Sequence, residues 1–269
     1  MFKWLKTFRM CYELRNFSLA AEKLYISQPA VSNQLKQLEE ELDCVLFVRT
    51  GKQEMTPTKT AEVLYGRVLN LADDWEETLH LVRGQTGNIL PCRIGASHTF
   101  AVYYLPTILN VMIAEFPMLS FEVEMLNSEE VLEGVEKHNY HLGFIEKPLV
   151  TGTSERIELL KDELVIAGPI DSDVWLSREE TSGVYHYMDY FLTDHNLNPK
   201  RMLIKNNEVI VRLLAEGLGT SIISKKALPK GVPFTTLGEE YLRPCFAVKG
   251  SHLTASVYDE LIERIKQIW

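Results

Sequence analysis

The sequence lacks any long hydrophobic run, since no stretch approaches the roughly 20 apolar residues that a membrane-spanning helix needs. Its first residues are basic and partly apolar, but Lys3, Lys6 and Arg9 interrupt them before the apolar core of a signal peptide could form. The four cysteines are scattered without close pairs, which argues against a zinc knuckle or a disulfide scaffold. We therefore expect a soluble, cytoplasmic protein with reduced thiols and no membrane partner.

Motifs of catalysis and metal binding are missing as well. The seven histidines are dispersed, and the sequence contains neither an HExxH nor a GxSxG pattern. An enzyme would need a nucleophile with a base, or clustered metal ligands. We therefore expect no enzyme, no metal site and no cofactor.

What is present is the composition of an ordinary globular protein of 269 residues, with 46% hydrophobic and 24% charged residues, which favours two or three folding units. The net charge of −9 is distributed unevenly. Residues 1–60 hold nine Lys and Arg against seven Asp and Glu, a net of +2, which leaves −11 for the rest. A slightly basic N-terminal part on an acidic remainder suits a protein whose N-terminal part alone approaches phosphates.

The first 42 residues predict three short helices. Apolar side chains at helical spacing indicate the first helix over 3–14. The second is expected over 18–24 with Ser18 as its N-cap, and the third from Ser27, the next N-cap candidate, to about residue 42. Two helices joined by a tight turn are typical of a helix-turn-helix.

The third predicted helix has an apolar and a polar face. The side chains expected to be buried are Val31, Leu35, Leu38 and Leu42. Its first turns carry hydrogen-bonding side chains, namely Gln28, Ser32, Asn33 and Lys36. A helix-turn-helix places these turns in the major groove of DNA. The alternative, a structural bundle whose polar positions face water, stays open because composition does not distinguish the two.

A polar, basic loop over 49–53, which contains Arg49 and Thr50, follows the third helix and has the composition of a wing that touches the DNA backbone or minor groove.

A long connecting helix is predicted over 59–84. Its apolar or small residues recur at alternating steps of three and four, as in a heptad seam: Ala61, Leu64, Val68, Leu71, Trp75, Thr78 and Val82, supplemented by Leu79. We expect Leu64, Val68, Leu71, Trp75 and Leu79 to contact a second chain; the alternative is that the helix packs on its own domain. Gly84, Gly87 and Pro91 predict a hinge over 85–91.

From residue 92 strands and helices alternate, which predicts an α/β domain with two lobes: lobe I over about 92–162 and 235–269, and lobe II over about 163–234. The fold class is therefore α + α/β. Ligands in open α/β sheets lie at the carboxyl ends of strands. There the sequence places Ser97, His98, Thr99, Glu146, Gly219, Thr220 and Ser221, which suit a small carboxylate or oxyanion. The alternative for each Ser or Thr is helix capping.

The N-terminal run SLAAEKLYISQPAVSNQLKQLEEELDCVLFVRTGKQEMTPT resembles the DNA-binding domain of LysR-type transcriptional regulators. This resemblance implies a winged helix-turn-helix over 1–58 that binds DNA through Gln28, Pro29, Ser32, Asn33, Lys36, Arg49 and Thr50. Asn33 departs from the arginine common in the family, and Ala61 stands where its glycine usually follows the TPT segment. In that family the linker helix forms the dimer.

The segments IGASHTFAVYYLP, LGFIEKP and LLAEGLGTSIIS resemble the effector domain of the same family, a relative of periplasmic solute-binding folds. Read across, the resemblance implies effector contacts from Ser97, His98, Thr99, Glu146, Thr181, Ser182 and Ser221. The segment ETSGVYH is similar to a looser copy of the family's glycine-serine-glycine-threonine loop. The combination of IGASHT, YLP and GFIE is similar to branches that regulate sulfur or carbon assimilation.

The sequence thus predicts a regulator whose partners are double-stranded DNA, a small anionic effector, itself as a dimer or tetramer, and RNA polymerase. Two alternatives remain. One is a thiol-based redox sensor, with Cys11 and Cys44 in the N-terminal part. The other is a solute-binding protein, which would leave the first 60 residues unexplained.

Overall fold

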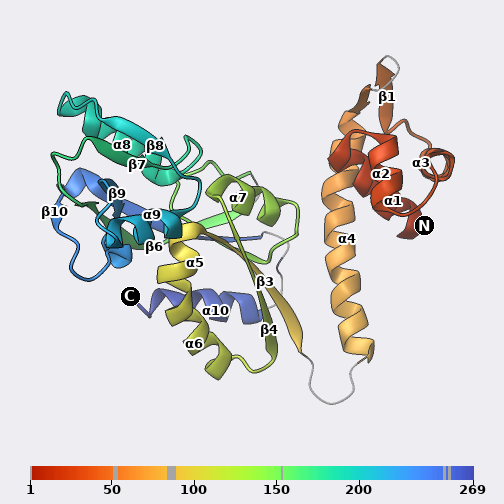
Figure 1. Ribbon diagram of the computed structural model, residues 1–269. Coiled ribbons are helices and arrows are strands. Elements are labelled where there is room, and N and C mark those ends of the chain that lie inside the picture. Colours follow the sequence, from red (N-terminus) through yellow and green to blue (C-terminus); the bar gives the residue numbers. More distant parts are fainter. Residues whose placement is uncertain (1, 51–53, 84–88, 153, 251–252, 254–255) are drawn as a thin grey trace. The chain divides into compact units, whose positions relative to one another are not determined.

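The computed structural model describes residues 2–50, 54–83, 89–152, 154–250, 253 and 256–269 (Figure 1). The chain divides into two compact units, residues 1–84 and 85–269, which we call the head and the body.

The head begins with three helices, α1 (Phe2–Leu14), α2 (Phe17–Lys23) and α3 (Gln28–Glu41). Their apolar faces enclose one core, in which Phe8, Val31 and Leu38 are almost fully buried. The predicted apolar face of the third helix is confirmed for Val31, Leu35 and Leu38 and is wrong for Leu42, which is 44% exposed because α3 ends one residue earlier.

One of the two predicted N-caps is confirmed and the other is wrong. Ser27 caps α3 as predicted, and its Oγ accepts a hydrogen bond from the amide of Ala30 at 3.3 Å. The N-cap of α2 is Asn16 and not Ser18, because the Asn16 Oδ1 accepts from the amides of Ser18 and Leu19. Asparagine is as good an N-cap as serine, so α2 starts as soon as α1 has ended.

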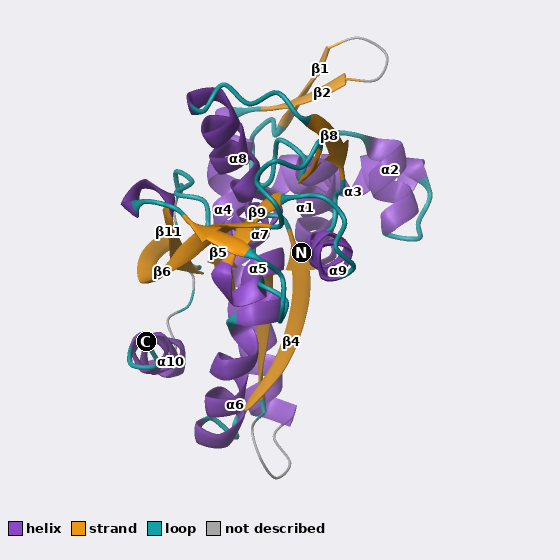
Figure 2. Cartoon of the chain, turned by 60° about the vertical axis from the view of Figure 1, so that its left-hand side comes forward, coloured by secondary structure: helices purple, strands orange, loops and turns teal. Residues whose placement is uncertain are grey.

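Strands β1 (Phe47–Thr50) and β2 (Glu54–Pro57) form an antiparallel hairpin, the expected wing (Figure 2). Helix α4 (Lys59–Arg83) follows, in agreement with the predicted connecting helix. The rest of the predicted loop over 49–53, residues 51–53, lies outside the described residues, as do the side chains of Arg49 and Thr50.

The predicted seam of α4 is divided between two environments. Val68 is 3% exposed and Leu64 is partly buried, and both pack on the core of the head. Leu71 and Trp75 are 48% and 46% exposed, and Leu79 is half-buried. The assignment of Val68 to a second chain is therefore wrong, because the core of its own unit already covers it.

The body is built on one mixed sheet in the order β10, β6, β11, β5, β3, β4, with β9 also paired to β6. The strands are β3 (Leu90–Ser97), β4 (Leu119–Leu126), β5 (Leu142–Ile145), β6 (Glu155–Ala167), β9 (Ser221–Ser224), β10 (Phe234–Thr236) and β11 (Leu242–Lys249). A separate parallel pair consists of β7 (Val174–Ser177) and β8 (Lys200–Leu203). Strand β6 pairs with β11 in its first part and with β9 and β10 at its end, so it continues from lobe I into lobe II.

Helices cover both lobes of the body (Figure 1). They are α5 (His98–Tyr103), α6 (Leu105–Glu115), α7 (Ser128–Glu136), α8 (Gly183–Asp194), α9 (Asn207–Ala215) and α10 (Ser256–Lys266), with short 3-10 helices at Lys225–Ala227 and Glu239–Tyr241. In lobe I, α5, α6 and α10 pack into one core cluster and α7 into another. In lobe II, α8 packs into one core cluster and α9 into another, and each cluster contains different residues of β6.

Several predicted boundaries in the body are corrected. Two helices lie between β3 and β4, because α5 ends at Tyr103 and Pro106 lies in the first turn of α6, which begins at Leu105. Strand β6 begins at Glu155 and passes through the predicted boundary between the lobes at residues 162 and 163. Of the predicted hinge, residues 85–88 lie outside the described residues, and Pro91 lies within β3.

Candidate nucleic-acid interface and effector cleft

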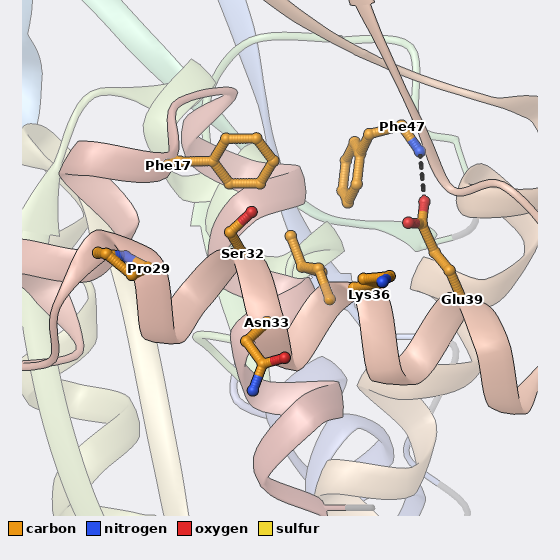
Figure 3. Close-up of a pocket in the computed structure, with 8 residues that line it drawn as sticks. Phe17, Pro29, Ser32, Asn33, Lys36, Glu39 and Phe47 are labelled. Atoms are coloured by element: carbon orange, nitrogen blue, oxygen red, sulfur yellow. Dashed lines mark hydrogen bonds between the residues drawn. The ribbon is translucent and has the colours of Figure 1, made fainter.

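The N-terminal half of α3 presents polar side chains on the surface of the head. Gln28, Pro29, Asn33 and Lys36 are exposed and Ser32 is half-buried. A groove of about 450 Å³ follows this face, lined by Ser32, Asn33 and Lys36 together with Phe17 of α2 and Phe47 of β1 (Figure 3). The structure thus brings the five residues predicted on α3 onto the exposed surface of one helix.

Buried hydrogen bonds hold α3 in place beneath this surface. Thr7 of α1 donates to Gln34 Oε1 at 2.7 Å. Glu39 Oε1 accepts from the amides of Leu46 and Phe47 at 2.7 and 3.3 Å, which fixes the base of the wing to the helix (Figure 3). A DNA recognition helix needs such support because its contacts with bases depend on geometry within a fraction of an ångström.

Lys36 makes one weak contact within the head. Its Nζ lies 3.5 Å from Glu40, and both side chains are more than 60% exposed. Exposed ion pairs of this kind contribute about 0–1 kcal/mol, so the ammonium group is available to a phosphate. Arg49 and Thr50 stand in β1 opposite Met55 and Glu54.

A second candidate site lies in the body, where five of the seven predicted effector residues line one narrow cleft. Ser97, His98 and Thr99 come from the junction of β3 and α5, Glu146 follows β5, and Ser182 precedes α8. The cleft has a free volume of about 20 Å³, which is close to the space that one bound water needs. Residues separated by 85 positions therefore form one site.

The other two predicted effector residues do not line this cleft. Thr181 is exposed, one residue before Ser182. Ser221 is 1% exposed, and its Oγ donates to the carbonyl of Leu176 at 2.7 Å, which joins β9 to β7. Both assignments are corrected: the loop turns Thr181 outward, and Ser221 has a structural partner.

Two buried arginines line the cleft that sequence reasoning did not identify, Arg178 and Arg243. Arg178 pairs with Glu179 through two hydrogen bonds of 2.9 and 2.8 Å. Arg243 of β11 stands opposite Asp162 of β6, and the Nη2 to Oδ2 distance is 2.6 Å. Neither residue belongs to a local sequence motif. The only indication in the sequence was a charged residue within an apolar segment that forms a buried strand.

The Asp162 carboxylate is a junction between the lobes. Its Oδ1 accepts from the hydroxyl of Tyr104, which precedes α6 in lobe I, at 2.6 Å. The same oxygen accepts from Ser224 Oγ, at the end of β9 in lobe II, at 2.5 Å. Asp162, Arg243 and Ser224 are all at most 2% exposed, so bulk water does not compete for these bonds.

The charges around the cleft follow from burial and pairing. Burial lowers the pKa of the Arg243 guanidinium, but the carboxylates of Asp162 and Glu146 outweigh it and raise the pKa overall, so Arg243 is a cation. Burial, followed by the nearby Arg178, lowers the pKa of His98, although Glu179, Glu146 and Glu130 oppose this shift. His98 is therefore neutral at neutral pH. Glu146 Oε1 accepts from the amide of Phe100 at 3.0 Å.

The cysteines are poor nucleophiles. Burial raises the pKa of Cys11 and of Cys92 to about 12, and it raises that of Cys245 as well. The pKa of Cys44 is raised by burial and by the acidic side chains of Glu39 and Asp43. The thiolate is the reactive form, so all four are held mainly as thiols at neutral pH.

Within the part of the chain that the structure describes, no helix is both long and apolar enough to cross a bilayer. No group of three or more His, Cys, Asp or Glu side chains in the same part is placed to hold a metal ion.

Comparison with known proteins matches both units. Residues 2–62 match the bacterial regulatory helix-turn-helix proteins of the lysR family, and residues 90–232 match the LysR substrate binding domain. The transcriptional regulator CysL of Bacillus subtilis is 32% identical over 249 residues, which cover 84% of this chain and 81% of CysL. The uncharacterised regulator YeiE of Escherichia coli K12 is 32% identical over 82% of this chain and 79% of its own.

Solved structures of low sequence identity share the fold. A full-length OxyR variant from Pseudomonas aeruginosa superposes with a TM-score of 0.64 at 16% identity, covering 99% of this chain and 94% of the other. Full-length CbnR in complex with its target DNA gives a TM-score of 0.61 at 18% identity and covers all of both chains.

The resemblance read from the SQPAVS helix and the IGASHT strand end is therefore confirmed, as is the fold class of a helix-turn-helix with a two-lobed α/β body. The relatives are transcriptional regulators and not enzymes. This chain belongs to the LysR family of DNA-binding transcriptional regulators with an effector-binding domain.

Proposed function

We propose that the head reads DNA through the first turns of α3, with Gln28, Ser32 and Asn33 at base edges and Lys36 on a phosphate. The observation that carries this proposal is the exposed polar surface of α3 above a rigid, hydrogen-bonded platform. Pro29 starts the helix, and Arg49 and Thr50 of the wing contact the backbone or minor groove.

The body senses a small anionic molecule in the cleft that Ser97, His98, Thr99, Glu146 and Ser182 line. Support comes from the two buried arginines, Arg178 and Arg243, and from the N-terminus of α8, where Ser182 makes no capping bond. A melting-temperature screen of the full chain against small metabolites tests this part, because a ligand that binds only the folded state raises the melting temperature. No response to any anion would contradict it.

Two chains associate through the exposed part of α4, where Leu71, Trp75 and Val82 are 48%, 46% and 78% exposed and Leu79 is half-buried. Such a stripe of large apolar side chains on one helix is costly in water unless a partner covers it. Two dimers form a tetramer that occupies adjacent DNA sites in the cytoplasm and acts on RNA polymerase. The effector binds two arrangements of the dimers with different affinity, so its binding shifts the tetramer from one arrangement to the other and changes the bend of the DNA.

Footprinting of the full chain on its own promoter region, with and without saturating effector, tests this mechanism. The expected result is a protected region of two half-sites about 10 base pairs apart, or a multiple of that spacing, whose extent and bend angle change with effector. An identical footprint and bend angle in both states would contradict it.

Thiol chemistry is the second candidate mechanism, and the raised pKa values of Cys11, Cys44, Cys92 and Cys245 disfavour it. Alkylation by a thiol reagent with and without peroxide distinguishes a thiol sensor from an anion sensor. A promoter affinity that changes on mild oxidation, with matching loss of one alkylation site, would favour the thiol sensor over the anion sensor.

A further inference from the structure

Two consecutive tyrosines at the end of α5 form hydrogen bonds that join lobe I to lobe II. Tyr104 donates to Asp162 Oδ1 at 2.6 Å, and the same oxygen accepts from Ser224 at the end of β9. Tyr103 donates from its hydroxyl to Glu208 Oε1 at 2.7 Å. Glu208 lies in the first turn of α9, a helix of lobe II, 105 positions further along the chain. The two tyrosines therefore link the lobes through two separate carboxylates.

The two hydrogen bonds differ in their exposure to water. Asp162 is 1% exposed, so breaking its bond to Tyr104 would leave buried polar groups without partners, which is costly. Glu208 is exposed and Tyr103 is half-buried, so water can replace the Tyr103 hydroxyl at the Glu208 carboxylate. The contact of Tyr104 is therefore permanent in the folded body, whereas that of Tyr103 opens at low cost.

Donor and acceptor of the second bond are both held in place. The ring of Tyr103 packs against the core clusters of both lobes, one around β3 and α6 and the other around β6 and α9. Burial raises the pKa of the Tyr103 hydroxyl, and the hydrogen bond to Glu208 and its charge raise it further, so the hydroxyl is protonated and donates. The Asn206 side chain accepts from the amides of Glu208 and Val209, which fixes the turn that carries the acceptor.

The main chain joins the lobes at a place where strands can bend. The first part of β6 pairs with β11 in lobe I, and its end pairs with β9 and β10 in lobe II. The register between β6 and β11 shifts between Cys245 and Phe246, and such irregularities bend a strand. Lobes joined in this way rotate about the ends of a few elements. The bond between Tyr103 and Glu208 joins two helices outside these strands, so it resists that rotation.

We propose that the hydrogen bond between Tyr103 and Glu208 is a releasable latch that holds the two lobes in the arrangement of this structure. When the latch opens, the lobes rotate about β6 and β11 while the Asp162 junction stays closed. The latch itself requires no particular ligand and goes beyond the proposed function. One consequence rests on that function: α5 begins at His98 and ends at Tyr103, so a ligand that contacts the start of this short helix shifts the latch if it binds the open and closed states with different affinity.

The distance between the lobes of the full chain tests the latch. Spin labels on Glu133→Cys of α7 and Arg212→Cys of α9 report this distance, because the two side chains are 62% and 77% exposed and lie on different lobes. Labelled chains are diluted with unlabelled ones, and chains without the introduced cysteines give the background. Tyr103→Phe keeps the ring and should add a second distance, because losing one such hydrogen bond shifts the ratio of closed to open molecules by about tenfold. A distribution identical to that of the original chain would overturn the proposal.

Tyr140 provides a matched control. Its hydroxyl donates to the exposed carboxylate of Glu124 at 2.5 Å and its ring is half-buried, but both residues belong to lobe I. Tyr140→Phe should therefore leave the distance between the lobes unchanged. An equal change in Tyr103→Phe and Tyr140→Phe would show that the loss of any such hydroxyl loosens the body, and would overturn the latch.

A double-mutant cycle tests whether Tyr103 and Glu208 act on one another. Glu208→Ala removes the acceptor at an exposed position and should change the distances in the same way as Tyr103→Phe. The double variant should resemble either single variant, because each change breaks the same bond. A change in the double variant equal to the sum of the two single changes would show that the residues act independently, and would overturn the proposal.

Promoter bending by the same variants separates the latch from the proposed function. The bend angle is expected to change with Tyr103→Phe and not with Tyr140→Phe. Altered distances between the lobes together with an unchanged bend angle would support the latch and contradict its consequence for DNA. Loss of selective DNA binding in the original chain would contradict the proposed function alone.

Discussion

The head and the body present their polar residues in opposite ways. On α3 of the head the side chains that we propose for DNA contact come from successive turns of a single helix and are exposed, as Gln28, Asn33 and Lys36 are. In the body the polar groups come from several segments and are buried, with Ser97, Glu146 and Arg243 all at most 5% exposed.

This difference agrees with the two kinds of ligand that we propose, a DNA duplex for the head and a small anion for the body. A DNA duplex is large and brings its own charges to the surface, so exposed donors on a rigid helix are sufficient. A small ion offers few contacts and must be removed from water to be distinguished, so its site needs preorganised groups in a medium of low dielectric constant. Buried charges are stable only when paired, and Arg178 and Arg243 each have a carboxylate partner.

The largest expected effect compares two neighbouring acids on β6. Asp162→Asn removes the charge that balances buried Arg243 and should lower the free energy of unfolding by about 3–5 kcal/mol. Glu163→Gln breaks the exposed pair with Lys225 and should cost no more than about 1 kcal/mol. Urea unfolding of each variant, followed by far-ultraviolet circular dichroism, gives the two values, and equal losses would contradict the role of the buried junction.

A medium effect is expected on the recognition surface of the head. Gln28→Ala should leave stability unchanged, because the side chain is exposed, and should reduce discrimination between base pairs at one operator position by roughly 1–3 kcal/mol. Fluorescence anisotropy with operators altered one base pair at a time measures this loss. Equal weakening on every sequence would show that Gln28 contacts the backbone and that α3 is placed differently.

Lys36→Ala is the matched change on the same helix. Because its ammonium group is expected to contact a phosphate, binding should weaken similarly on all sequences, and the slope of log affinity against log salt should fall by about 1. An unchanged salt dependence would remove Lys36 from the interface.

A smaller effect tests the cap of α2. Asn16→Ala removes the acceptor for the amides of Ser18 and Leu19 and should cost about 1 kcal/mol of stability. Ser18→Ala should have almost no effect, because Ser18 lies within the helix and is not its cap. Thermal unfolding of the two variants measures both losses of stability. A larger loss for Ser18→Ala would support Ser18 as the N-cap, as the sequence predicted.

The smallest effect is a pH dependence of the body. The pKa of His98 in the folded state lies below its value of about 6.5 in the unfolded chain, so the unfolded state takes up the proton first. The stability that neutral His98 contributes is therefore complete above pH 6.5 and is lost as the pH falls through the folded-state pKa. Melting temperatures from pH 8 to pH 5 should fall more for the original chain than for His98→Gln, and parallel curves would contradict the shift.

The sequence allowed prediction of those features that depend on local pattern. The three helices of the head, Ser27 as a cap and the polar face of α3 follow from periodicity and capping chemistry. Ser97, His98 and Glu146 were found because strand ends converge in an α/β sheet.

The features that were missed depend on contacts between distant parts of the chain. Arg243 and Asp162 are 81 residues apart, and only the antiparallel register of β6 and β11 makes them partners. Val68 has the spacing of a dimer seam, but the core around Phe8 and Val31 covers it. Thr181 and Ser182 are neighbours in a loop, and periodicity does not show which of them faces the cleft.

The most direct test of the central claim, that α3 of an associated pair of chains reads base sequence, is a competition between two duplexes of equal length. One carries a site selected by the protein from random sequences, and the other is its scrambled version. At physiological salt the account predicts that the chain prefers the selected duplex by about 10³-fold or more and binds it as a dimer or larger assembly. A monomer that binds both duplexes equally, even at low ionic strength, would contradict it.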